Sequence, residues 1–151
     1  MNDSPSALPN VHEAKFVERF IISNRRERFR IKLADRKRRP EFLDKLAHDL
    51  VGMLDQRCIV KHEDFRRVLP LFGDPSVCHC IGGGADLDGR EFRIDDVGDS
   101  EWRHADSFVL SFVPGELAFY EAEIGTCVRC LLIADTKLRA KAIAMLASRR
   151  H

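Results

Sequence analysis

A short turn between two apolar segments constrains the fold of this chain more than any other feature. Pro114-Gly115 suits the central positions of a type II turn and separates segment 107–113 from segment 116–121. Strands joined by so short a turn must be antiparallel, because parallel strands need a crossover connection of about a dozen residues or more. The turn therefore disfavours a doubly wound parallel sheet.

Apolar runs bounded by turn residues predict the other strands. One strand is predicted at 76–81, where it runs into Gly82-Gly83-Gly84, and another at 127–133. A short strand is also expected at 58–60. Together with the two segments around the turn, these strands predict a mostly antiparallel sheet of about three to five strands.

Helical spacing of apolar residues and favourable helix ends predict helices on both sides of the strands. Asn10 is a suitable N-cap for a helix over 11–23, and Pro40 suits the first turn of the clearest amphipathic helix in the chain. Asp135 or Thr136 is expected to cap a closing helix at the C-terminal end.

Segment 25–34 carries two conflicting patterns. Asn24 and Glu27 resemble a capping box, which predicts a helix. Basic and apolar residues alternate from Arg28 to Leu33, which is the period of a strand. We favour the helix, because the cap signal lies where such a helix would begin.

Helices first, antiparallel strands second and one closing helix last define an α+β fold. The 151 residues suit one domain, so we expect a lead-in over 1–9 and a single globular domain over 10–151. No apolar run approaches the ~18–20 residues that cross a bilayer, and the first ten residues lack the pattern of a secretory signal. We therefore expect a cytoplasmic protein without a membrane partner.

Charge is distributed unevenly along the chain. The net formal charge is +1 overall, but it is +5 over residues 1–72, −9 over 73–123 and +5 over 124–151. Two interpretations remain open. The basic and acidic segments neutralise each other within the monomer, or one of them faces a partner of opposite charge.

The basic segment 25–39 is the strongest candidate for polyanion binding. Arginine suits phosphate because its planar guanidinium donates two hydrogen bonds at once. Few aromatic residues accompany the segment to stack on bases, since the chain has one Trp and one Tyr. The nine candidate residues are Arg25, Arg26, Arg28, Arg30, Lys32, Arg36, Lys37, Arg38 and Arg39.

The acidic residues of segment 86–106 are the candidates for contact with a partner protein. A metal-dependent hydrolase using Asp88 with Glu91 is a further hypothesis, but Arg93 stands where a lysine base would be expected, and arginine rarely loses its proton. The candidate contact residues are Asp86, Asp88, Glu91, Asp95, Asp96, Asp99 and Glu101.

Five cysteines without a secretory signal indicate reduced thiols. Zinc prefers thiolate ligands, so Cys78, Cys80, Cys127 and Cys130 form a candidate zinc site. If 127–133 is a strand, Cys127 and Cys130 project from opposite faces, so we expect buried thiols, no metal and no cofactor.

These observations favour a small, non-enzymatic binding protein that acts through opposed charged surfaces. A protein partner is expected, as in a regulator or an inhibitor of the immunity type that masks a basic enzyme with segment 86–106. The alternative is an RNA- or DNA-binding module that uses the basic segment 25–39, and the third hypothesis is the hydrolase above.

Overall fold

The computed structural model describes residues 10–97, 107–124 and 126–148, apart from the side chains of residues 46–48, 123, 124, 126 and 127. The expected lead-in 1–9 lies outside these residues. Within them, one six-stranded sheet has the order β1-β6-β5-β4-β2-β3, and every pairing is antiparallel. The strands are β1 (Ile59–Val60), β2 (Val77–Gly82), β3 (Glu91–Arg93), β4 (Phe108–Val113), β5 (Leu117–Ile124) and β6 (Thr126–Ile133).

The Pro114-Gly115 turn joins the two central strands as predicted. Gly115 has a φ of 71°, the positive value that a type II turn requires at its third position. The N–H of Glu116 donates to the C=O of Val113 at 2.9 Å, which closes the turn. Strand β4 consequently pairs with β5, and β5 continues into its pairing with β6.

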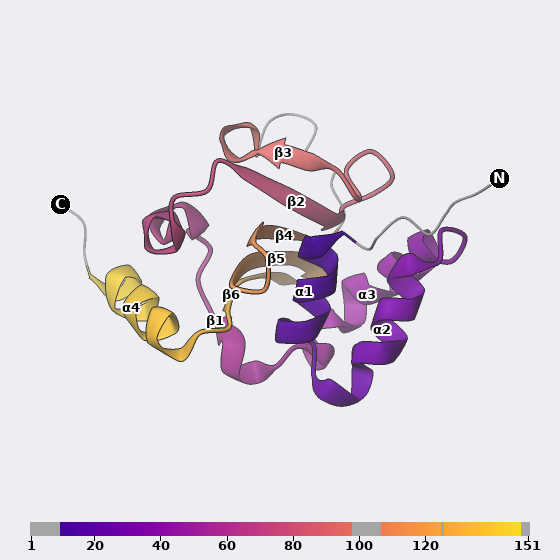
Figure 1. Cartoon of the computed structure of the whole chain (residues 1–151), viewed down its shortest axis with the longest axis horizontal. Helices are drawn as coiled ribbons and strands as arrows, with labels where there is room; N and C mark the ends of the chain where they lie inside the picture. The colour runs from indigo at the N-terminus through magenta and orange to yellow at the C-terminus, as the bar shows by residue number, and fades with distance from the viewer. Residues whose placement is uncertain (1–9, 98–106, 125, 149–151) are drawn as a thin grey trace.

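Three N-terminal helices cover one face of this sheet, and a closing helix packs against the other (Figure 1). Asn10 caps the first helix by accepting from the N–H groups of His12 and Glu13, and Asp135 caps the last by accepting from Leu138. The helices are α1 (Val11–Phe20), α2 (Arg26–Ala34), α3 (Arg39–Met53) and α4 (Thr136–Ala147).

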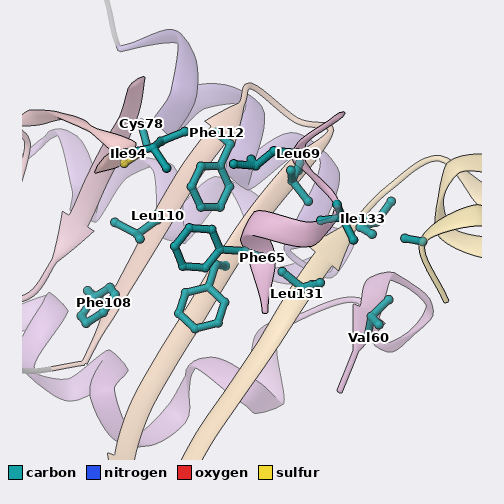
Figure 2. Packing of buried hydrophobic residues seen from close by; sticks show 14 of the residues in the cluster. Val60, Phe65, Leu69, Cys78, Ile94, Phe108, Leu110, Phe112, Leu131 and Ile133 are labelled. Atoms are coloured by element: carbon teal, nitrogen blue, oxygen red, sulfur yellow. The ribbon is translucent and has the colours of Figure 1, made fainter. Parts of the chain in front are cut away.

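Both faces of the sheet are buried, because the central strands are apolar on both of their alternating sides. Beneath α1–α3, residues such as Val109, Tyr120 and Leu132 pack against the helices. On the opposite face, the ring of Phe65 lies 4.9 Å from Phe112, measured between centroids, within a cluster that also holds residues of α4 (Figure 2). Two separate apolar clusters therefore hold the sheet between its covering elements.

The α+β class, the N-terminal helices and the closing helix are confirmed, but the sheet is larger than predicted. The strand expected at 58–60 is present as β1, whereas β3 was not predicted, because its three residues are below the length at which alternation can be recognised. Strand β3 (Glu91–Arg93) pairs with the edge of β2, so part of the acidic segment belongs to the sheet.

Two expected helix boundaries were wrong. Helix α1 ends at Phe20, because Ile21 is extended and forms a β-bridge with Leu54. Segment 26–34 is helical, but the capping box is absent: Asn24 lies in a preceding 3-10 turn, and Arg25 occupies the N-cap without a side-chain hydrogen bond. No helix among the described residues is long and apolar enough to cross a membrane.

Candidate functional site

Helix α2 and the turn that follows it display most of the predicted cations to solvent. Arg28 and Lys32 lie one helical turn apart, so they share a side of the helix. Ile31 stands between them with 61% of its surface exposed. We call this region the basic surface, and its cations, exposed or half-exposed, are Arg25, Arg28, Arg30, Lys32, Arg36, Lys37 and Arg38.

Asp35 fixes the conformation of the turn between α2 and α3. Its Oδ1 accepts from the N–H of Lys37 at 3.0 Å and from that of Arg38 at 3.3 Å. Its backbone C=O also accepts from the N–H of Arg39 at 2.8 Å. The turn is therefore held by the side chain and the backbone of Asp35, and Arg36, Lys37 and Arg38 are exposed along it.

Arg39 points the other way and binds two carboxylates beneath the helices. Its Nη1 and Nη2 donate to Glu13 at 2.6 and 2.7 Å, and its Nε and Nη2 donate to Asp88 at 2.8 and 2.9 Å. Its side chain is 16% exposed, against 13% for Glu13 and 19% for Asp88. Asp88 in addition accepts from the N–H of Gly82 at 2.8 Å. We call these three side chains the Arg39 network.

This arrangement sets the charge state of the network. Burial by itself would raise the pKa of Glu13, but hydrogen bonds from Arg39 and His79 outweigh it and lower that pKa to about 2. Burial would likewise lower the pKa of Arg39, but bonds to Glu13 and Asp88 outweigh it and raise that pKa. All of these bonds favour the charged forms, so the network is ionic at neutral pH.

Two histidines and a serine continue the network across the sheet. The Nε2 of His79 lies 2.7 Å from Glu13, and its ring stacks on that of His12 with centroids 5.5 Å apart. The Nδ1 of His12 lies 2.8 Å from the Oγ of Ser111. Burial and the neighbouring His79 lower the pKa of His12, whereas Glu91 and Glu13 oppose this.

A hydrogen-bonded serine and histidine resemble a nucleophile with its base. Ser111, however, is 1% exposed and lies within β4, so its oxygen is not open to a substrate. The geometry instead joins α1 to β4 through His12. We assign this pair an anchoring role.

Two of the predicted contact residues are largely withdrawn from solvent. Arg39 was assigned to the polyanion-binding segment and Asp88 to the partner-facing acidic segment, but the two side chains bind each other and are 16% and 19% exposed. At this ion pair, a cation of the basic segment and a carboxylate of the acidic segment neutralise each other within the monomer, which is one of the two interpretations of the charge pattern. Arg26 is also partly withdrawn, since its Nε donates to the C=O of Ile21 at 2.8 Å.

The described part of the acidic segment is only weakly acidic. Asp86, Glu91, Asp95 and Asp96 are exposed, but Arg93 lies 3.9 Å from Asp95. The Nη1 of Arg90 donates to the backbone C=O of Asp86, which places a second cation beside them. The predicted contacts Asp99 and Glu101 lie outside the described residues.

The candidate zinc ligands lie in different layers. Cys78 and Cys80 belong to the apolar cluster on the α4 side of the sheet, whereas Cys130 belongs to the cluster beneath α1–α3. These three thiols therefore do not converge, and no group of three His, Cys, Asp or Glu side chains suited to a metal occurs among the described residues. Cys127 lies on β6, and its side chain is outside the described part.

The described thiols should react slowly in the native state. Burial raises the pKa of Cys78 to about 12 and that of Cys130 to about 11, from an ordinary value of 9.0. This rise in the pKa of Cys78 reduces the fraction of reactive thiolate about a thousandfold at neutral pH. Burial also keeps the reagent away from the thiol and slows the reaction further. In a Cys127→Ser variant, thiol titration should detect the four buried cysteines only after denaturant is added. Rapid native reaction of any of them would contradict this.

Comparison with family models, with curated proteins and with solved structures gave no match, so the function is argued from the geometry of the site alone.

Proposed function

We propose that this chain is a non-enzymatic binding protein that recognises an acidic surface of a partner protein through its basic surface. The proposal places it in the cytoplasm as a regulator of that partner. The observation that carries it is the exposed Ile31 among the cations of α2.

An apolar centre within a charged rim is the usual anatomy of a protein–protein contact. Burial of an aliphatic side chain supplies affinity, and surrounding charges supply rate and specificity. Ile31 is 61% exposed, whereas Leu33, the other branched aliphatic side chain of α2, is buried in the cluster beneath the helices. The exposed isoleucine adds nothing to that cluster, which supports a role in contact with a partner.

Nucleic acid is the second candidate, and the exposed arginines favour it. Phosphate binding, however, gains nothing from an isoleucine at the centre of the surface, and Asp35 and Glu27 are interspersed among the cations. The metal-dependent hydrolase is less well supported, because the oxygens of Asp88 already accept from Arg39 and Gly82.

Capture of a partner from native cytosol with matched variants tests the proposal. Ile31→Asp and the pair Arg36→Glu with Arg38→Glu should each lose a protein that the wild type retains, and salt should weaken its capture. Ile143→Asp is the control, since Ile143 is an aliphatic residue on α4 that is 40% exposed and lies away from the basic surface. All variants should unfold at denaturant concentrations close to that of the wild type.

Binding of RNA and DNA separates the two candidates. We expect only weak binding at physiological salt. A nucleic-acid site with about 5 phosphate contacts would instead give a log–log salt slope near −4 to −5. Submicromolar nucleic-acid affinity at physiological salt, lost with Arg36→Glu and Arg38→Glu but kept with Ile31→Asp, would overturn the proposal.

A further inference from the structure

A cavity distinct from the basic surface is lined by arginines from four separate parts of the chain. It lies between the end of α1, the start of α2, the 3-10 turn at 56–58 and the start of α4, and its volume is about 570 Å³. The arginines are Arg19, Arg26, Arg57 and Arg139. Positive side chains repel each other, so their convergence on one cavity requires a physical reason.

The acidic side chains of the cavity, Glu18 and Asp55, neutralise only part of this positive charge. Glu18 forms an ion pair with Lys15 at 2.9 Å, and Asp55 forms one with Arg57 at 2.9 Å. Each of these two acids therefore has its own cation. Among the described residues, none of Arg19, Arg26 and Arg139 forms an ion pair, although Arg19 and Arg26 act on Glu18 at longer range. Four arginines against two acids leave the lining of the cavity with a net charge of +2.

Backbone contacts orient two of these side chains and leave further donors unused. The Nε of Arg26 donates to the C=O of Ile21 at 2.8 Å, and the Nη2 of Arg139 donates to the C=O of Ile59 at 2.9 Å. The Nε of Arg139 is buried and has no hydrogen-bond partner within the protein. Each guanidinium has five N–H donors, so most remain available to an acceptor.

The first turn of α4 adds to the same field. Thr136 is the first residue of this twelve-residue helix and is one of the residues that line the cavity. A helix N-terminus presents unpaired N–H groups and a positive dipole end, which both favour an anion. The Asp135 carboxylate caps this terminus by accepting from the N–H of Leu138, so the dipole adds only a part of its field to that of the arginines and would not define a site without them.

We propose that this cavity binds the phosphate group of a small phosphate monoester. Planar guanidinium groups match phosphate oxygens in pairs, and a monoester carries about 1.5 to 2 negative charges at neutral pH, close to the net charge of +2 that four arginines and two acids give the lining. The volume is within the range of sites for small ligands, about 300–1,000 Å³. This inference does not rest on the proposed protein partner, because Arg19, Arg57 and Arg139 are not part of the basic surface.

Calorimetric titration with inorganic phosphate and with adenosine 5′-monophosphate tests this, with adenosine as the uncharged control and sodium chloride holding the ionic strength constant. Saturable 1:1 binding of both phosphates and none of adenosine is expected. Equal affinity would assign recognition to the phosphate alone, and tighter binding of the monophosphate would assign a contribution to its nucleoside; both results support the site. Absence of saturable phosphate binding would overturn it.

Paired variants locate the binding. Arg19→Gln should weaken phosphate binding at least about tenfold, since a hydrogen-bonded charge is lost. Arg19 is exposed and forms no ion pair among the described residues, so this variant should fold normally. Arg28→Gln makes the same chemical change on the basic surface and should leave the affinity unchanged. An equal loss in both variants would overturn the proposal, because it would show attraction to net charge only.

Amide chemical shifts, measured residue by residue, show where on the protein the phosphate binds. Added phosphate should move the backbone amide signals of Cys58 and Thr136, which line the cavity, and should leave those of Arg30 and Ile31 unmoved. The same pattern should be lost in Arg19→Gln. Shifts confined to α2 and its following turn would assign the phosphate to the basic surface and contradict the inference.

Discussion

Replacing Arg39 by methionine should destabilise the protein by about 3–5 kcal/mol, the cost typical of breaking a buried ion pair from one side. The loss would leave Glu13 and Asp88 facing each other, both less than one fifth exposed, without the guanidinium that binds them. Methionine keeps much of the length and packing of the side chain, so the effect would report mainly on charge. Urea unfolding at neutral pH measures it.

Two further variants show whether the effect arises from uncompensated charge. Arg38→Met changes a neighbouring arginine whose side chain is 73% exposed, and it should alter stability by no more than about 0.5 kcal/mol. Adding Glu13→Gln and Asp88→Asn to Arg39→Met should recover part of the lost stability, since neutral amides tolerate burial better than unpaired carboxylates. A loss of less than about 1 kcal/mol in Arg39→Met would show that the network is solvated.

The Arg39 network has a consequence for the basic surface. It fastens the start of α3 to α1 and to the loop that carries Asp88, and Arg39 directly follows the turn that displays Arg36 to Arg38. Arg38, the last of the exposed cations, is therefore linked by a peptide bond to Arg39, whose side chain is fixed in the network. The turn that carries Arg36 to Arg38 is thus already ordered before binding. Part of the affinity of the basic surface is expected to come from this preorganisation, because less conformational entropy is lost on binding.

Local signals predicted most of the fold. The Pro114-Gly115 turn determined the antiparallel arrangement, and Asn10 and Asp135 cap α1 and α4 in the structure. In each case the information lies within a few residues of chain. The alternative strand period in segment 25–34 failed because its apolar positions are not all buried: Phe29 and Leu33 face the core at helical spacing, while Ile31 is exposed.

The network was beyond prediction because its parts are distant in sequence. Arg39 bonds to residues 26 and 49 positions away, and Glu13 bonds to His79 across 66 positions. No periodicity links such positions, and a charge count along the chain cannot tell a buried arginine from its exposed neighbours. His12, Glu13 and His79 were therefore missed, and the ion pair that withdraws most of Arg39 and Asp88 from solvent was not foreseen.

Acid should weaken the fold through Glu13 over a defined range of pH. Its pKa is about 2 in the folded chain against 4.5 ordinarily, so the folded state holds the deprotonated form more strongly. The resulting stabilisation, about 3 kcal/mol, is fully present above the ordinary pKa of 4.5 and is lost as the pH falls toward the folded pKa of about 2. Between pH values of about 5.5 and 3, roughly 2 kcal/mol of it should disappear.

A Glu13→Gln variant isolates this effect from the protonation of other carboxyl groups. Glutamine keeps the shape of the side chain but cannot titrate, so the variant should be less stable at neutral pH and should lose stability less steeply in acid. The difference in unfolding free energy between wild type and variant, measured by urea titration at a series of pH values, should therefore shrink as the pH falls below about 4.5. The lowered pKa of His12 also favours folding at higher pH, and that contribution begins to fall near the ordinary pKa of 6.5. Because the Glu13 charge opposes this lowering, Glu13→Gln should make the His12 contribution somewhat larger. A difference that stays constant between pH values of about 5.5 and 3 would show that Glu13 titrates alike in the folded and unfolded chain, which the hydrogen bonds from Arg39 and His79 do not permit.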